Sequence, residues 1–279
     1  MTSGSWFESV VPGDAVPAHA DIDTSVPHIA RVYDYWLGGK DNFAPDRAVA
    51  EKVMATFPDV LASVRAQRAF LGRAVHYLVT EAGIRQFLDV GTGLPASDNT
   101  HEVAQRAAPE SRIVYVDNDP IVLAHARALL VGSPEGATAY LDADLRDTDE
   151  IVGKAARILD FGQPVAVMLL GVLHCIPDEE NPAAIVDRLM ATVAPGSYLV
   201  VSHPAIDIAT SQIGRSMQDY NDQAPVPLTA RTYAGVRRFF EGLDMVEPGL
   251  VQLHRWRPGP GDLDPNRELA NYGGVGRKP

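Results

Sequence analysis

The chain has 279 residues, 46% of them hydrophobic, which is enough to bury a full core. Its net charge of −12 has the wrong sign for gripping a nucleic-acid backbone. The single Cys175 excludes a disulfide within the chain, and no N-terminal run resembles a signal peptide or membrane span. We therefore expect a cytoplasmic protein without a nucleic-acid or membrane partner. The histidines lack metal-ligand spacing, so we expect no metal site.

The N-terminal third is predicted to be an arm followed by helices. Residues 1–22 are rich in Ser, Gly, Pro and Ala and are typical of a flexible arm. Apolar residues at helical spacing predict a short amphipathic helix over about 29–37, with Ser25 as candidate N-cap and Gly38 as the stop. Two further helices are expected, at about 46–56 and 60–78. We expect residues 23–82 to form a helical cover over the rest of the chain.

Residues 83–279 alternate between strand and helix patterns. Strands are predicted at about 87–90, 112–117, 138–141, 164–170 and 198–201, and helices at about 97–107, 121–130, 149–158 and 183–193. This alternation predicts right-handed crossovers and a parallel sheet covered on both faces. Two more helices, at about 207–220 and 231–243, and two closing strands, at about 245–253 and 268–276, complete the core.

The first strand ends in a glycine turn, Asp89-Val90-Gly91-Thr92-Gly93. Glycine permits backbone conformations that a Cβ forbids, and the helix beyond presents unpaired N–H groups, so the turn suits a ligand that lies against the main chain. With Ala96, the spacing also meets the loose dinucleotide fingerprint. An ordinary strand-to-helix turn is the alternative.

Acidic residues follow three successive predicted strands. In an open parallel sheet the ligand lies beyond the carboxyl ends of the strands, where the sequence places Asp89, Asp117 and Asp144. The two oxygens of the Asp117 carboxylate suit the two hydroxyls of a ribose, and Asp144 suits an adenine amino group. Together they predict a nucleoside-containing ligand.

Several strings resemble known motifs. Residues 87–93, 116–117, 142–145 and 170–174 look like successive motifs of class I S-adenosylmethionine-dependent methyltransferases. Residues 22–43 resemble the N-terminal signature of a bacterial family of S-adenosyl methyltransferases, and residues 271–278 resemble its C-terminal end. The resemblance implies an α/β, Rossmann-like class I fold with a mostly parallel seven-stranded sheet, helices on both faces and the N-terminal helical cover.

The resemblance also implies S-adenosylmethionine (SAM) as cofactor. Asp89, Gly91 and Gly93 would hold its methionine part, Asp117 its ribose, and Asn118, Asp144 and Leu145 its adenine. The full set of expected cofactor residues is Tyr33, Asn42, Asp89, Gly91, Thr92, Gly93, Asp117, Asn118, Asp144, Leu145, Gly171 and Val172. Tyr33 and Asn42 enter the set because the signature helix and its following loop would cover the cofactor.

The main rival for the glycine turn is a dinucleotide. Asp89 argues against it, because a carboxylate beside a pyrophosphate is repelled, whereas beside a methionine ammonium group it is useful. A SAM-binding regulatory module without transfer activity is a further alternative.

The chemistry of transfer needs alignment more than a nucleophile. Candidate catalytic groups are His174, His203 and Tyr33, and for each histidine the alternative is a hydrogen-bonded structural role. The fourth-strand segment lacks the Asn/Asp-Pro-Pro-aromatic string, which, with the acidic charge, favours a small-molecule methyl acceptor. The sequence leaves monomer and homodimer both open.

Overall fold

The computed structural model describes residues 23–122, 132–259, 261–264 and 266–279. The expected flexible arm, and most of the helix expected at 121–130, lie outside these residues. Within them no helix is both long and apolar enough to cross a bilayer.

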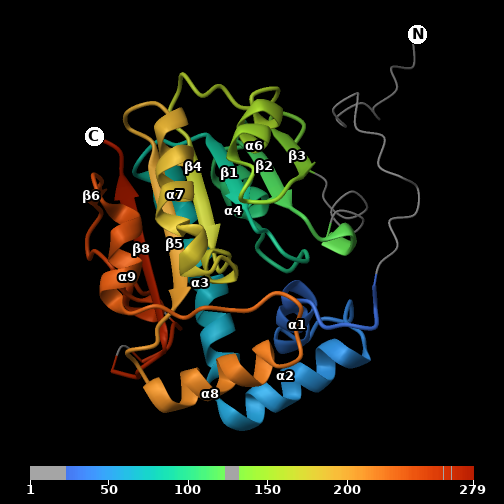
Figure 1. Cartoon of the computed structure of the whole chain (residues 1–279). Helices are drawn as coiled ribbons and strands as arrows, with labels where there is room; N and C mark the ends of the chain where they lie inside the picture. The colour runs from blue at the N-terminus through green and yellow to red at the C-terminus, as the bar shows by residue number, and fades with distance from the viewer. Residues whose placement is uncertain (1–22, 123–131, 260, 265) are drawn as a thin grey trace.

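The strands form one mixed sheet with the order β3-β2-β1-β4-β5-β8-β6, while β7 pairs with β8 (Figure 1). The strands are β1 (Gln86–Val90), β2 (Arg112–Asp117), β3 (Ala137–Asp142), β4 (Ala166–Leu170), β5 (Tyr198–Pro204), β6 (Asp244–Met245), β7 (Val251–Gln252) and β8 (Asn271–Arg277). The first five run parallel to one another, and β8 is antiparallel to β5.

The two shortest strands share one place in this sheet. β6 pairs with the last residues of β8, at Gly276 and Arg277, whereas β7 pairs with Tyr272 and Gly273 near its start. Both therefore lie along the edge of β8 that faces away from β5. The sheet has seven positions, as the resemblance implied. The closing strand expected at about 268–276 is confirmed as β8, whereas the one expected at about 245–253 is two separate two-residue strands, β6 and β7.

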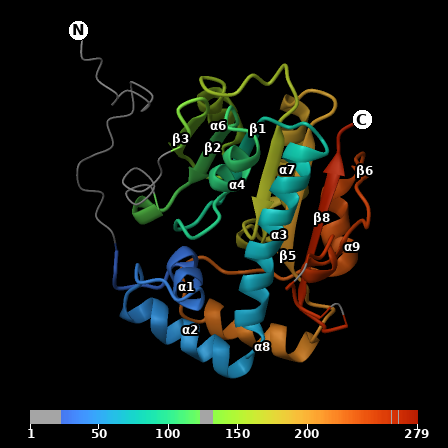
Figure 2. The same ribbon diagram turned by 180° about the vertical axis from the view of Figure 1, so that it is seen from behind.

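Helices cover both faces of the sheet, as predicted. The strands alternate their side chains between two cores, so that Phe87 packs under α3 (Val60–Thr80) and α4 (Thr100–Ala107), while Leu88 faces the opposite core. That second core is covered by α6 (Thr148–Ala155), α7 (Pro182–Thr192) and α9 (Tyr233–Arg237), with the short 3₁₀ helix η3 (Arg238–Phe240) after α9. Figure 2 shows α3 and α4 on the face that Figure 1 hides.

A third layer of helices lies at the carboxyl ends of the parallel strands (Figures 1 and 2). It consists of α1 (Ile29–Trp36), α2 (Ala44–Thr56) and α8 (Thr210–Asn221), which share a separate apolar core. The cover therefore contains a C-terminal helix beside the N-terminal ones. The boundary expected after residue 82 stays a prediction, and α3, which precedes it, packs on the sheet as well as on α1.

The signature string is shaped by one buried ion pair. Asp46 is fully buried and lies 3.1 Å from Arg31 Nε, while its oxygens also accept hydrogen bonds from the backbone N–H groups of His28 and Phe43. His28, and not the expected Ser25, is the N-cap of α1. Because Asp46 bonds to His28 and Phe43, which lie on either side of α1 in the sequence, this helix is held in a defined orientation over the sheet.

Candidate functional site

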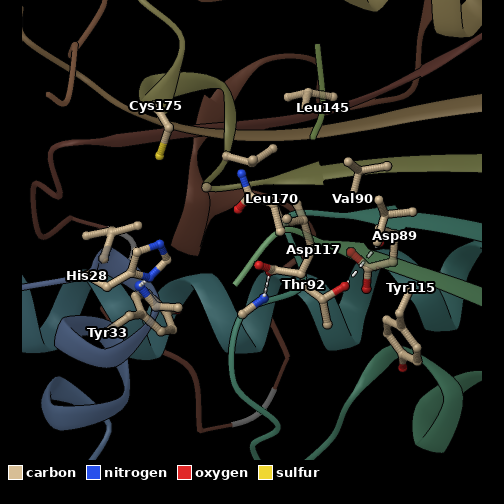
Figure 3. A pocket seen from close by; sticks show the side chains of 18 of the residues that line it. His28, Tyr33, Asp89, Val90, Thr92, Tyr115, Asp117, Leu145, Leu170 and Cys175 are labelled. Atoms are coloured by element: carbon tan, nitrogen blue, oxygen red, sulfur yellow. Dashed lines mark hydrogen bonds between the residues drawn. The ribbon is translucent and has the colours of Figure 1, made fainter. Parts of the chain in front are cut away.

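A cavity of about 240 Å³ lies beyond the carboxyl ends of β1, β2, β3 and β4, against α1 (Figure 3). Asp89 and Asp117 lie next to each other in it, while Tyr33 enters from α1 and His28 from the residue before that helix. Apart from Asn42, every residue expected to hold the cofactor lines this cavity: Tyr33, Asp89, Gly91, Thr92, Gly93, Asp117, Asn118, Asp144, Leu145, Gly171 and Val172. We call it the strand-end cavity.

The glycine turn forms the floor of the strand-end cavity. Gly91 has φ +75° and its N–H donates to Val116 O at 2.8 Å. A Cβ at this position would lie 2.4 Å from Val172 Cγ2, whereas a Cβ on Gly93, at φ +67°, would meet no atom of the described residues within 4 Å. The two glycines thus have different tasks, since Gly91 lets two segments approach and Gly93 leaves open space.

Asp117 ties the glycine turn to the end of β2. Its Oδ2 accepts the Gly93 N–H at 2.8 Å, and its Oδ1 accepts the Asp119 N–H at 3.0 Å. Burial nevertheless raises the pKa of Asp117, because it outweighs these two hydrogen bonds. Each oxygen keeps a lone pair for a further donor, such as a ligand hydroxyl.

Asp89 is a buried acid at the end of β1. Its side chain accepts a hydrogen bond from Thr100 Oγ1 at 2.6 Å. Burial raises the pKa of Asp89 to about 6, although the Thr100 bond and the nearby Arg68 act in the opposite direction. A buried carboxylate with so little compensation is stabilised by a ligand cation.

At the end of β3, Asp144 faces Asn118 and Arg146. Asn118 Nδ2 donates to Asp144 at 3.1 Å, and the Arg146 guanidinium pairs with Asp144 and with Glu180. The Asn118–Asp144 pair presents amide and carboxylate groups to the cavity, which is the mixture of donors and acceptors that the edge of a purine needs.

A second, smaller cavity of about 110 Å³ adjoins the first beneath α1, α3 and α8. Ile29, Tyr33, Gln67, Gly171 and Tyr220 line both cavities. Tyr33 stands between them with its hydroxyl donating to Val64 O at 3.2 Å, and burial raises its pKa. We call this second space the helix cavity.

His174, one of the three candidate catalytic residues, lines the helix cavity and not the strand-end cavity. It belongs to the 3₁₀ helix η1 (Leu173–Cys175), and its Nδ1 has no hydrogen-bond partner among the described residues. Burial, with a smaller contribution from the charge of Arg231, lowers the pKa of His174 to about 4. The imidazole is therefore neutral at pH 7.

Comparison with known proteins identifies the family. The model of the S-adenosyl methyltransferase family matches residues 15–279. The chain belongs to this S-adenosyl methyltransferase family. The resemblance of the signature and strand-end motifs is thereby confirmed. A search of curated proteins found no match.

Two solved structures are similar over nearly their whole length. A DUF574 family protein from Streptomyces avermitilis MA-4680 is 44% identical, with 92% of this chain and 100% of that chain covered and a TM-score of 0.90. A protein from Thermobifida fusca YX, provisionally described as a methyltransferase, is 40% identical, with 95% and 99% covered and a TM-score of 0.86.

The fold extends to a more distant methyltransferase. The plantazolicin methyltransferase BpumL, solved with a triazolic desmethylPZN analogue and SAH, is 10% identical with a TM-score of 0.52, and 89% of this chain and 95% of that chain are covered. At this identity the likeness concerns the fold alone.

The structure corrects the expectation for Asn42. Its side-chain amide donates to Asp34 Oδ2 at 2.8 Å and to Gly39 O at 3.1 Å, outside both cavities. Asp34 also accepts the Asp41 N–H at 2.9 Å. Asn42 thus closes the loop after α1, because its amide can satisfy several buried groups at once.

The expectation for His203 is corrected in the same way. β5 continues to Pro204, so His203 lies within the strand and not beyond it, and its side chain is fully buried. Arg231 Nη1 lies 2.9 Å from its Nε2, and Pro204 O lies 2.9 Å from its Nδ1. Both ring nitrogens are occupied by the protein, so His203 has the structural role that was its alternative.

Several residues of the site were not predicted from the sequence, and four of them come from outside the strand ends. His28, Gln67, Arg68 and Tyr220 line the strand-end cavity, but they come from α3, α8 and the segment before α1. Helical spacing placed Gln67 and Arg68 within a long helix and Tyr220 at the end of another. Only His28 had a further signal, because it lies in the signature string.

Proposed function

We propose that this chain binds SAM in the strand-end cavity and transfers its methyl group to a small-molecule acceptor. The observation that carries the proposal is the convergence of Asp89, Asp117 and Asp144, from the ends of three neighbouring strands, around one glycine turn. When bound, SAM supplies a methyl group on a sulfonium, so the C–S bond breaks as the bond to the acceptor forms and S-adenosylhomocysteine (SAH) leaves.

The residues present fit this cofactor. Asp89 is a buried carboxylate that accepts from Thr100, and the methionine ammonium group would complete its charge balance. Arg68 Nε is buried and has no partner among the described residues, while its Nη2 donates to Ser97 O at 2.7 Å. Arg68 is thus a cation placed to receive the methionine carboxylate.

The other end of the cavity suits the nucleoside. Asp117 would accept from the ribose hydroxyls, and the Asn118–Asp144 pair would contact the edge of the adenine. Leu145 and Val116 supply apolar surface for its faces. Gly91 and Gly171 would let the methionine part lie along the backbone, since both have positive φ.

The same geometry disfavours a nicotinamide dinucleotide. A pyrophosphate at the glycine turn would lie beside the buried carboxylates of Asp89 and Asp117, and like charges in a buried site repel strongly. Arg68 and Arg146 line the cavity, but Arg146 is neutralised by Asp144 and Glu180.

Methyl transfer is tested with SAM that carries a labelled methyl group. The full-length protein is incubated with this SAM and a metabolite extract, with Asp117→Ala as the control. We expect label in a small-molecule product with the wild type and much less with the variant. SAH binding without transfer to any acceptor would contradict the enzymatic proposal and favour a regulatory module.

A further inference from the structure

The helix cavity contains buried polar atoms that the protein leaves unpaired. Its lining is mainly apolar, with Trp36, Phe57, Ile213 and Met217 among the side chains. Within this lining, Ser63 Oγ and His174 Nδ1 are both buried and neither has a hydrogen-bond partner among the described residues. Buried polar groups are nearly always satisfied, so two such atoms in one cavity point to a bound polar group.

The position of His174 is fixed by its surroundings. The backbone carbonyl of His174 accepts from Thr229 N at 2.8 Å, and the Arg231 guanidinium holds the neighbouring carbonyls of Leu173 and Ile176 at 2.9 and 2.6 Å. His174 is less than one-tenth exposed, and its ring packs edge-on against His203 at 6.1 Å between centroids. The imidazole is thus held rigidly at the wall of the cavity, which is what a recognition group needs.

The charge of the lining restricts the occupant. Among the described residues that line the helix cavity, none is Asp, Glu, Lys or Arg. A cation or an anion placed there would lose its hydration without gaining a counter-charge, which is costly. Alkyl amines and carboxylates are charged at pH 7 and are therefore disfavoured, whereas a hydroxyl group is neutral.

The size and shape of the lining restrict it further. The cavity volume is about 110 Å³, which is less than the roughly 150 Å³ of an apolar protein cavity that holds one benzene molecule, so the occupant has no more than one ring and uses space at the junction with the strand-end cavity. Tyr33, Trp36, Phe57 and Tyr220 contribute aromatic surface, and aromatic side chains favour ring partners. Five lining residues are shared with the strand-end cavity, so the molecule in one cavity lies next to the ligand in the other.

We infer that the helix cavity is the acceptor subsite and takes a neutral, one-ring compound with a phenol-type hydroxyl, which donates a hydrogen bond to His174. This inference rests on the proposed function. Ser63 Oγ, which also lacks a partner among the described residues, would offer a second hydrogen bond to this compound. When the phenol-type oxygen is methylated, its proton passes to Nδ1 of the neutral imidazole and is then released to solvent. A phenolic hydroxyl, with a pKa of about 10, gives up this proton more readily than an alkyl hydroxyl.

Binding of phenol to the full-length protein saturated with SAH tests the inference. The probe is phenol, with benzylamine and benzoate as charged analogues of similar size. Methionine methyl groups give the site-specific readout, because Met217 lines the cavity and Met190 lies in the core on the far face of the sheet. We expect phenol to shift the Met217 methyl resonance but not that of Met190, and to bind at least tenfold more tightly than either charged analogue.

The His174→Ala variant supplies the second arm, with the exposed His76→Ala as matched control. We expect at least tenfold weaker phenol binding for the first and no change for the second, with SAH affinity kept in both. Equal phenol binding by the wild type and His174→Ala, or tighter binding of a charged analogue, would overturn the inference. If the wild type does not bind SAH at all, the proposed function is overturned instead. Failure of the phenol subsite and failure of the proposed function therefore give different results.

Discussion

The imidazole Nδ1 of His28 lies 2.8 Å from Oδ2 of the buried Asp119. This contact joins the segment before α1 to the loop after β2. Burial acts to raise the pKa of Asp119, but His28, the Ile121 N–H and Arg31 together outweigh it and hold that pKa below its ordinary value. The signature string is thus linked to the strand-end cavity by a contact between an imidazole and a buried carboxylate.

Replacement of His28 by Ala should therefore loosen the cover. The Asp119 carboxylate would stay buried without its imidazole partner, and we expect a loss of about 1 to 3 kcal/mol in the free energy of unfolding. SAH affinity should fall as well, because His28 lines the cavity. Urea unfolding and calorimetry measure the two effects. Unchanged values for both would show that the pair contributes nothing to the site.

Asp89→Asn should stabilise the ligand-free protein at pH 7. The folded-state pKa of Asp89 is raised from 3.8 to about 6, so the folded protein binds the proton more tightly than the unfolded chain, and stability is lost as the pH rises through this window. The neutral amide avoids this loss, which amounts to at most about 3 kcal/mol above pH 6. Urea unfolding of wild type and variant at pH 4 and pH 7 checks the sign, since the gain should appear only at pH 7.

The same carboxylate predicts the pH dependence of binding. The methionine ammonium group requires ionised Asp89, so SAH affinity for the wild type should be about tenfold lower at pH 5 than at pH 7. Asp89→Asn should bind SAH weakly at both pH values, without this dependence. A wild-type affinity that is flat between pH 5 and 7 would mean that Asp89 does not contact the ammonium group.

The two turn glycines form a matched pair for mutation. Ala at either position has an unfavourable positive φ, which costs about 1 to 2 kcal/mol. Gly91→Ala additionally places a Cβ 2.4 Å from Val172 Cγ2, whereas the Cβ of Gly93→Ala would meet no atom in the described part of the chain. We expect Gly91→Ala to lower the free energy of unfolding by about 1 to 3 kcal/mol more than Gly93→Ala does. Adding Val172→Ala to the Gly91→Ala variant should recover part of this difference. Equal thermal stability of the two glycine variants would contradict the packing at Val172.

Much of the fold follows from the order of patterns along the chain. Alternating strands and helices allow few arrangements, so the parallel sheet and the strand-end acids were predictable. Asp117 and Asp144 could be predicted as site residues because they follow the ends of predicted strands. The single place shared by β6 and β7 was not predictable, because it depends on which half of β8 each short strand meets.

The predictions of site residues were wrong or incomplete where long-range contacts determine the position of a side chain. His203 was expected beyond a strand that in fact continues to Pro204, so its side chain points into the core and not toward a ligand. Asn42 follows the signature helix but satisfies Asp34. Tyr220 lines the cavity because α8 packs against α2. This long-range contact could not be predicted from the local sequence pattern of α8.

The most direct test of the account is calorimetric titration of the full-length wild type and of Asp117→Ala with SAH and, separately, with NAD. We predict that the wild type binds SAH and not NAD, and that Asp117→Ala loses about 1 to 3 kcal/mol of SAH binding free energy because the ribose hydroxyls lose their acceptor. Binding of NAD without binding of SAH would contradict it.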